Sequence, residues 1–425
     1  MIQIFQCFGF FLIHCNEEHQ GARGLNMSQN TPPAWRRVPP SVWALGIVSL
    51  LMDFSSEMIH ALLPIYLVGS LGASMTEVGV IEGVAEATAA IVKIFSGAIS
   101  DWVGKRKLLA LIGYGLAALT KPMFPLAPNV SWITSARFLD RVGKGIRGAP
   151  RDALVADVTP ASLHGAAFGL RQSLDTIGAF LGPAAAVLIL WLTLNDIHVV
   201  FWVATLPAIL AVIVLFYGVD EPVKDRNAEG GFRFPLHKNE LSRLGAAFWR
   251  VAAVATIFSL ARFSEAFLIL KAQAVGLPVI FAPLVLVFMN LIYASAAYPI
   301  GVMSDRIGRW SLLALSLVVL MSADGVLAYA PSLVWVCCGV VLWGLHMGMS
   351  QGLFAALVAD VAPAALRGTA FGVYNLFSGL ALFLASFLAG RLWDQFGDWA
   401  TFLMGGSFAC VALIGLFMIP KNLDL

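Results

Sequence analysis

Two passages of this chain each occur twice, about two hundred residues apart. Residues 97–106 read GAISDWVGKR, and residues 301–310 read GVMSDRIGRW. Residues 153–170 (ALVADVTPASLHGAAFGL) and 356–373 (ALVADVAPAALRGTAFGV) are identical at 13 of 18 positions. The two offsets are 204 and 203 residues, so the spacing is kept across both passages. A repeat of this kind predicts two structurally equivalent halves.

The composition identifies lipid as the solvent of both halves. Hydrophobic residues make up 59% of the chain and charged residues 12%, against about 45–50% and about 25% in an ordinary soluble domain. A membrane-spanning helix needs roughly 20 mostly apolar residues. Twelve stretches of the sequence meet this requirement: 43–68, 77–99, 107–126, 131–156, 163–190, 197–218, 246–271, 279–301, 310–329, 332–359, 367–390 and 399–419.

The polar stretches between these segments give the expected domain organisation. A tail over 1–42 precedes an N-terminal six-helix bundle over 43–219, and a linker over 220–245 leads to a C-terminal bundle over 246–419 and a tail over 420–425. Most loop and tail Lys and Arg residues fall on the side of the two tails, and the other side has only Lys271 and Arg391. This bias predicts that both termini are cytoplasmic. The net charge of +2 reflects it and does not indicate nucleic-acid binding.

Residues 1–26 fit this plan poorly. They are apolar at the start, but they lack the basic region and cleavage site of a signal peptide and are too short to span a bilayer. We expect them to be an over-extended start or a disordered tail, with Met27 the more natural beginning. The five cysteines of the chain have no metal-site spacing, and we expect them to be small apolar packing residues.

The ten-residue repeat resembles the loop motif Gly-x-x-x-Asp-Arg-x-Gly-Arg-Arg of the major facilitator superfamily, a family of membrane transporters. The resemblance covers roughly residues 40–420 and implies an all-α fold with twelve transmembrane helices in two six-helix halves. It also implies that the motif acts as a latch on the cytoplasmic side, although Trp102 replaces the usual Arg of the first copy. The implied latch residues are Gly97, Asp101, Gly104, Lys105, Arg106, Gly301, Asp305, Arg306, Gly308 and Arg309.

A second motif lies in the fifth apolar segment. Gly169, Gly178, Gly182 and Pro183 match Gly-x8-Gly-x3-Gly-Pro, which resembles the antiporter motif of exporters in this superfamily. The final Gly-Gly of that motif is absent here. Glycines at this spacing also allow two helices to pack closely, so a packing role and an export role remain open. The second half lacks the pattern, and this asymmetry favours export.

Ionisable residues inside apolar helices are candidates for function, because each costs about 2.5–3.5 kcal/mol at the centre of a membrane. Paired carboxylates in a low-dielectric setting can carry a proton. The candidates for proton coupling are Asp53, Glu57, Glu82, Glu86, Asp175 and Glu265. The candidates for a substrate cavity are His60, Arg137, Arg141, Arg171, Arg262, Asn290, Trp343, His346, Ser350 and Asn375. The basic residues of the fourth segment are equally explained as a structural ion-pair network within the N-terminal half.

These features favour a secondary active transporter that exports a small molecule by alternating access, with protons as the coupling ion. One alternative is export of a divalent metal such as nickel or iron, because DFSSEM, GKGIRGAPRDAL and GLHMGMSQG resemble a bacterial subfamily that includes nickel-resistance permeases. Another is a non-transporting membrane sensor. No nucleotide-binding loop or hydrolase motif is present, so we expect neither an enzyme nor a cofactor or resident metal. We expect a monomer in the bilayer of a bacterial inner membrane.

Overall fold

The computed structural model describes residues 37–160, 163–221, 241–307, 309–363 and 366–418. By their contacts, residues 38–425 form one compact unit, and this unit is described here. The expectations for residues 1–26, for most of the linker over 220–245 and for the tail over 420–425 fall outside the described residues. The proposed division into two bundles therefore remains a prediction.

Long helices account for nearly all of the first half. The transmembrane helices are α2 (Pro40–His60) with its extensions α3 (Leu63–Ile65) and η2 (Tyr66–Ser70), α4 (Met75–Val103), α5 (Arg106–Thr120) with η3 (Lys121–Met123), α6 (Val130–Asp157), α7 (His164–Leu192) and α8 (Ile197–Gly218). These bounds agree with the predicted segments to within a few residues. The described part of the chain contains no strand.

The second half repeats the plan. Its helices are α10 (Gly245–Ala261), α11 (Ala266–Ala274), η5 (Val279–Phe281), α12 (Leu284–Ile307), α13 (Arg309–Ala328), α14 (Leu333–Val361), α15 (Arg367–Phe396) and α16 (Asp398–Phe417). The predicted segment 246–271 is interrupted, because residues 262–265 are not helical and separate α10 from α11. The sequence there, ARFSEA, contains neither Gly nor Pro, so nothing in the local pattern predicts the break.

Local sequence explains where several helices begin and end. Ser74 and Glu77 form a reciprocal capping box at the start of α4. Gly104 ends the same helix in a left-handed conformation at φ 68°, which glycine adopts without a steric penalty. Asp196 accepts hydrogen bonds from the first amides of α8. The polar connections thus fix the helix ends, and the apolar runs between them form the spans.

Nine spans in the described residues are long and apolar enough to cross a membrane by length and composition alone. The helices missing from this set are α4, α5 and α6. Helix α5 has only 15 residues, and α4 and α6 carry the charged residues predicted to have functions. With these three, the described helices make up the twelve spans predicted from the sequence, and the all-α membrane fold is confirmed.

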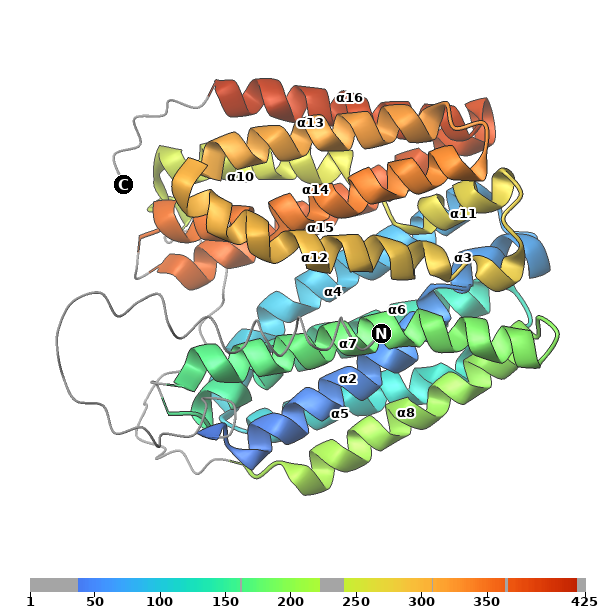
Figure 1. The fold of residues 1–425 in the computed structure, drawn as a ribbon. Helices are drawn as coiled ribbons and strands as arrows, with labels where there is room; N and C mark the ends of the chain where they lie inside the picture. Colours follow the sequence, from blue (N-terminus) through green and yellow to red (C-terminus); the bar gives the residue numbers. More distant parts are fainter. Residues whose placement is uncertain (1–36, 161–162, 222–240, 308, 364–365, 419–425) are drawn as a thin grey trace, which may run out of the picture. The chain divides into compact units, whose positions relative to one another are not determined.

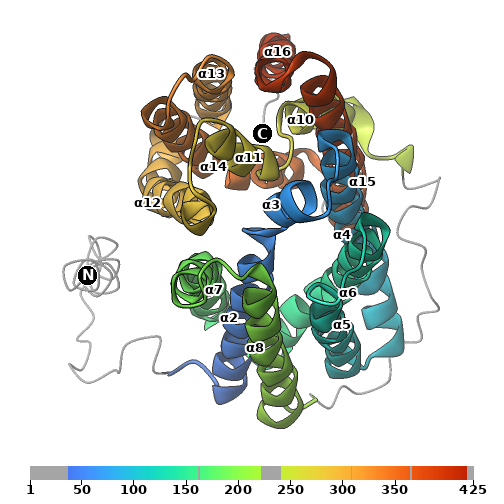
Figure 2. The same cartoon turned by 90° about the vertical axis from the view of Figure 1, so that its right-hand side faces the viewer.

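Figure 1 shows the helices running side by side. We call the end at which α2 begins and α8 ends the tail face, and the end bearing α3 and α11 the opposite face. In the first half α2 packs against α7 and α8, and α6 packs against α4 and α5; in the second half α13 and α12 pack against α14. Helices α4 and α15 form the largest interface between the halves, as the end view in Figure 2 also shows.

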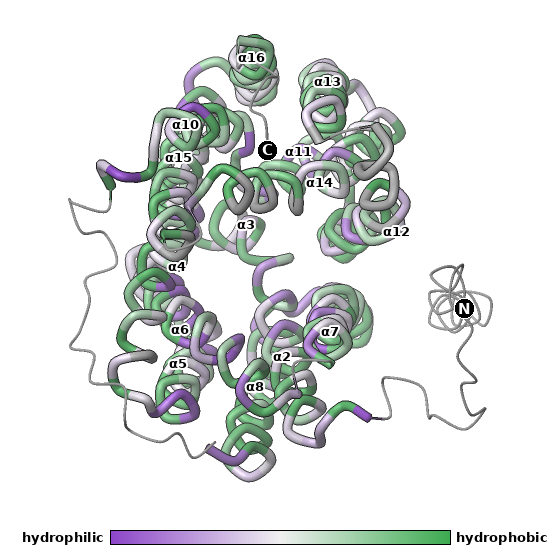
Figure 3. Tube along the Cα trace, turned by 90° about the vertical axis from the view of Figure 1, so that its left-hand side faces the viewer, coloured by the Kyte–Doolittle hydropathy of each residue, from purple (hydrophilic) through white to green (hydrophobic). Residues whose placement is uncertain are grey.

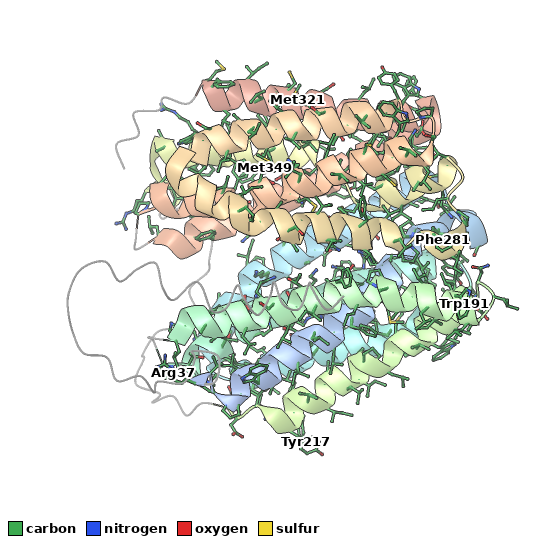
Figure 4. The ribbon with its side chains drawn as sticks, in the orientation of Figure 1. Arg37, Trp191, Tyr217, Phe281, Met321 and Met349 are labelled. Atoms are coloured by element: carbon green, nitrogen blue, oxygen red, sulfur yellow. The ribbon has the colours of Figure 1, made fainter. Side chains whose placement is uncertain are left out.

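The outer surface of the helices suits a lipid environment. Large apolar side chains such as Leu119 and Leu206 are more than half exposed. Trp191 and Phe281 lie at the opposite face, whereas Tyr217 lies near the other end of α8 (Figure 4). Aromatic residues are typical of the two membrane–water interfaces. Hydrophilic stretches, coloured purple, occur among α2, α4, α6 and α7 in Figure 3.

Candidate functional site

A cavity of about 410 Å³ lies between the two halves, bounded by α2, α4, α6 and α7 on one side and by α10 and α15 on the other. Among the predicted coupling residues, Asp53, Glu86 and Asp175 line it. Among the predicted cavity residues, Arg262 and Asn375 do so. The remaining charged and polar lining residues are Lys93, Lys144, Arg147, Arg151, Ser259, Tyr374 and Ser378. The cavity therefore combines charges from the first half with mainly uncharged polar groups from the second.

Next to this cavity, Glu82 and His60 take part in a buried ion-pair network. Arg137 donates from Nη2 to Glu82 Oε2 at 2.8 Å, and both side chains are almost fully buried. His60 lies between two carboxylates, with Nε2 3.3 Å from Glu82 Oε2 and Nδ1 3.4 Å from Glu57 Oε2. Arg137 and Glu82 are thus engaged with each other, as the structural interpretation of the fourth segment predicts.

A second network joins α2, α4, α6 and the end of α5. Lys121 Nζ lies 2.9 Å from Asp140 Oδ1 and donates to Ser56 Oγ at the same distance. Arg141 lies 3.6 Å from Asp140 Oδ2 and 3.4 Å from Glu86 Oε1. The two networks balance acidic groups with basic ones inside the first half, as charges in an apolar medium require.

A third network lies nearer the tail face, between α6 and α7. Arg151 pairs with Asp152 at 3.2 Å and with Asp175 at 3.8 Å. Arg171 lies 3.9 Å from Asp152 and 3.7 Å from Asp175. Two arginines and two aspartates thus form one four-membered cluster, and Arg171 belongs to it rather than to the lining of the cavity.

Several charged groups at the cavity have no ion-pair partner among the described residues. In the part of the chain that the structure describes, no oppositely charged group lies within 4.0 Å of the side chains of Lys93, Lys144 or Arg262. Within the same described ranges, the carboxylate of Asp53 has no ion pair either, although it lies close enough to Asp175, Lys144 and Arg147 to interact with them electrostatically. Glu265, in the break between α10 and α11, is likewise without an ion pair within this part of the chain.

The predicted residues of the second half separate into two groups. Trp343, His346 and Ser350 share one buried face of α14, as their spacing predicts, but they do not line the cavity. His346 Nδ1 lies 2.9 Å from the Ser316 carbonyl oxygen, and Ser350 donates to the His346 carbonyl oxygen. Asn290 is half-buried on α12, also outside the cavity lining.

The glycines of the proposed antiporter motif bring α7 against α2. A Cβ on Gly182 would lie 2.6 Å from the Phe54 carbonyl oxygen, and one on Gly178 would collide with the backbone of Leu50. Pro183 is buried within α7. Gly169, in contrast, has open space around it. The contacts of Gly178 and Gly182 account for their small size by packing, and the link of the motif to export remains a prediction.

The latch residues are described only in part. A Cβ on Gly97 would lie 3.4 Å from Ala149 Cβ on α6, which is an ordinary van der Waals contact. Gly104 ends α4, and Lys105 is exposed before α5. Arg106 donates to Asp157 Oδ2 at 2.5 Å and to the Ala153 carbonyl oxygen, so it ties the start of α5 to the end of α6. The side chains of Asp101, Gly301, Asp305, Arg306 and Arg309, and Gly308 altogether, lie outside the described part. Their latch role stays a prediction.

Close packing of α4 against α15 seals the molecule at the opposite face. A Cβ on Gly83 would lie 2.8 Å from the Phe383 carbonyl oxygen, and one on Gly390 would lie 2.8 Å from Thr76 Cα. Helix α4 begins at the opposite face, and these contacts come before the cavity residue Lys93 along it. Helix α15 ends at the opposite face, and these contacts come after the cavity residue Asn375 along it. The cavity therefore lies on the tail-face side of the seal.

Asp394 of α15 completes the seal by capping a helix of the other half. Its Oδ1 accepts a hydrogen bond from Met75 N at 3.0 Å, and its Oδ2 accepts from Thr76 N at 2.8 Å and from Thr76 Oγ1 at 2.5 Å. These are the first residues of α4, where amides lack partners within the helix. Asp394 was not predicted from the sequence, because no local pattern pairs residues more than 300 positions apart.

Lys121 was not predicted from the sequence, although an isolated cation in an apolar stretch is a usable signal. Lys93 shares one helical stripe with Glu82 and Glu86, and Lys144 and Arg147 belong to the basic residues of the fourth segment. The sequence thus indicates all three as charges inside the membrane, but they were not among the candidate site residues. Arg147 stacks over the Tyr114 ring at 4.8 Å.

Known proteins share both the sequence and the fold. An uncharacterised MFS-type transporter of Methanocaldococcus jannaschii is 32% identical over 394 residues, covering 90% of this chain and 96% of the relative. The inner membrane transport protein YajR of Escherichia coli is 24% identical, and the alignment covers 88% of this chain and 82% of YajR. The crystal structure of the nucleoside transporter NupG superposes with a TM-score of 0.74 at 14% identity, covering 90% of this chain and all of that one.

A further structure, a bacterial homologue of the lysosomal transporter Spinster in an inward-facing and unoccupied conformation, has a TM-score of 0.72 at 15% identity and covers 92% of this chain and 97% of its own. The sequence model of the family described as Major Facilitator Superfamily matches residues 45–386 of this chain. Twelve helices, an internal repeat and this match together lead to one conclusion. The chain belongs to the Major Facilitator Superfamily of membrane transporters.

Proposed function

We propose that the protein is a proton-coupled secondary active transporter that exports a small molecule by alternating access. The observation that carries the proposal is the charged cavity of about 410 Å³ between the halves. Its volume lies within the range of roughly 300–1,000 Å³ that is typical of small-molecule sites. A cavity at the interface of two repeats is the arrangement through which rocking of the halves moves a substrate.

Asp53 is the proposed proton carrier. It lines the cavity, has no ion-pair partner among the described residues and lies beside Asp175. Two neighbouring carboxylates repel each other when both are ionised, so one proton between them relieves the repulsion. Glu82 forms an ion pair with Arg137 at an N–O distance of 2.8 Å, and Glu86 forms one with Arg141 at 3.4 Å. Both carboxylates are therefore stabilised in the ionised form. Of the six candidate carboxylates, Asp53 therefore best fits a group that gains and loses a proton.

The proposed direction is from the cytoplasm outwards, in the membrane of a bacterial cell. The Lys and Arg bias favours a cytoplasmic tail face, and the cavity lies on the tail-face side of the α4–α15 seal. In this state substrate enters from the cytoplasm. The resemblance of Gly178, Gly182 and Pro183 to the antiporter motif favours exchange of that substrate for an external proton.

The cavity fits an organic compound better than a divalent metal. Five basic residues and three acidic residues line it, so a metal cation would meet a net positive charge. Among the described residues, no group of three or more His, Cys, Asp or Glu side chains is arranged to hold a metal ion. Uncharged polar groups of Ser259, Tyr374 and Asn375 are better suited to hydrogen bonding with an organic molecule.

Transport in proteoliposomes tests the proposal. The purified protein is reconstituted with a pH-sensitive dye inside, and a panel of organic anions, organic cations, neutral compounds, Ni²⁺ and Fe²⁺ is added under an imposed pH gradient. We expect at least one organic compound to move together with a proton signal that empty liposomes lack. Proton-linked movement of Ni²⁺ or Fe²⁺ alone would instead support metal export. If no compound moves and no proton signal appears, the transport proposal fails.

A further inference from the structure

We propose that the cavity recognises a small organic anion and holds its carboxylate or phosphate group between basic residues of the two halves, chiefly Lys144 of α6 and Arg262 at the end of α10. This inference rests on the proposed function and adds the chemical class of the substrate. It follows from the charges that remain at the cavity after every observed ion pair has been assigned.

The lining of the cavity has an excess of positive charge. Its basic residues are Lys93, Lys144, Arg147, Arg151 and Arg262, and its acidic residues are Asp53, Glu86 and Asp175, which leaves a formal charge of +2 with all of them ionised. A positive field in a low-dielectric cleft concentrates anions and repels cations.

Most acidic residues near the cavity are already engaged. Glu86 faces Arg141, and Asp175 is shared by Arg151 and Arg171. Asp152 completes the cluster around the same two arginines. These three carboxylates form no ion pair with the basic residues that remain. Asp53 is the one carboxylate of the lining without an ion pair among the described residues, and it lies close enough to Lys144 and Arg147 to interact with them electrostatically.

The remaining basic residues of the lining form no ion pair among the described residues. Within the described ranges, no carboxylate lies within 4.0 Å of Lys93, Lys144 or Arg262, and Arg147 stacks on Tyr114 instead. The Nη1 atom of Arg147 is buried and has no hydrogen-bond partner there. An unpaired cation within a membrane protein is costly. A bound anion would supply the missing counter-charge and hydrogen-bond acceptors.

Arg262 ties this recognition to the second half. It follows the last residue of α10 in an extended conformation (φ −108°, ψ 96°), at the break before α11. Interrupted helices at the interface of two repeats are typical of substrate sites in transporters. Because Lys144 belongs to the first half and Arg262 to the second, an anion held by both attracts the halves towards each other. Ser259 and Asn375 on the same wall supply hydrogen-bonding groups for the rest of the molecule.

Binding to the purified protein in nanodiscs tests the anion class. The apparent melting temperature is followed during titration with phenyl phosphate, benzoate, benzamide and benzylamine at constant ionic strength. These probes share one ring and differ in charge. We expect saturable stabilisation by phenyl phosphate and benzoate, because a ligand that binds only the folded state raises its stability. We expect none with benzamide or benzylamine.

Variants locate the site. Lys144→Gln and Arg262→Gln are each expected to weaken the apparent affinity for phenyl phosphate by about tenfold, the usual contribution of one charge-assisted hydrogen bond. Lys144→Arg keeps the charge and is expected to restore most of the affinity. Arg243→Gln removes an exposed positive charge outside the cavity and is the matched control, with affinity expected to equal that of the unmodified protein.

The outcomes separate the anion site from the transport function. Stabilisation by benzylamine alone, absence of saturable stabilisation by both anions, or equal affinity in all variants would overturn the inference. Proton-linked transport of a neutral or cationic compound in proteoliposomes would then still support the proposed function. Conversely, anion binding that depends on Lys144 and Arg262, without movement of any compound in counterflow, would support the anion site and refute transport.

Discussion

Replacing Asp394 with Ala removes a carboxylate of α15 that caps α4 in the other half. Three hydrogen bonds are lost, from Met75 N, Thr76 N and Thr76 Oγ1. When the halves separate at the opposite face, water can take the place of the carboxylate, so the net effect is smaller than three bonds suggest. Loss of a helix N-cap costs about 0.5–2 kcal/mol.

The capped arrangement exists only while the opposite face is closed, so this energy acts on the equilibrium between the two states. A change of about 0.5–2 kcal/mol corresponds to a factor of about 2–30 in their ratio. We therefore expect Asp394→Ala to increase the population open at the opposite face by that factor, with little change in the amount of folded protein.

Distance distributions between two spin labels measure this population. Ser131 at the start of α6 and Ser332 before α14 are exposed and belong to different halves, and labels there require a background without the native cysteines. Asp196→Ala is the matched control, because Asp196 caps α8 within its own half. Compared with the unmodified protein, we expect Asp394→Ala to show a larger share of long distances between the labels. We expect Asp196→Ala to show no such increase. Identical distributions for the two variants would refute the reasoning.

Three further predictions concern packing, buried charge and the latch. Gly182→Leu should abolish transport and lower the yield of folded protein, because a side chain there meets the α2 backbone; normal transport would contradict this packing. Glu82→Gln leaves Arg137 buried without its counter-charge and should lower the free energy of unfolding by about 3–5 kcal/mol. Denaturation in detergent measures this change. The control, Glu77→Gln at the exposed start of the same helix, should change the free energy of unfolding little. Asp101→Asn and Asp305→Asn should slow transport at normal expression, and unchanged rates in both would count against the latch.

Much of the fold follows from the sequence, because each span needs a long apolar run and each connection contains polar or helix-capping residues. Helix α8 occupies the predicted range 197–218. The break at 262–265 was not predicted, because ARFSEA continues an apolar stretch without Pro or Gly. Its geometry comes from tertiary contacts, such as the hydrogen bond from Ser264 N to Ser386 Oγ.

The sequence predicts which types of residue form the site, but it only partly predicts which of them lie close together. Helical spacing correctly places Trp343, His346 and Ser350 on one face, but it does not tell which neighbours that face contacts. In the structure those neighbours include Phe258 and Ser316 rather than the cavity. In the same way, the mixture of acidic and basic residues on α2, α4 and α6 predicts compensation. Which carboxylate remains without a partner depends on distances that only the folded chain defines.

Coupling of transport to protons through Asp53 is the central claim, and one comparison tests it most directly. Counterflow and pH-driven transport of a compound identified with the panel are measured in the same proteoliposomes for the unmodified protein and for Asp53→Asn. Asn cannot gain or lose a proton, so the account predicts that the variant keeps substrate exchange and loses the response to the pH gradient. Full pH-driven transport by Asp53→Asn would contradict the account and move the coupling site to another carboxylate, with Glu265 the next to test.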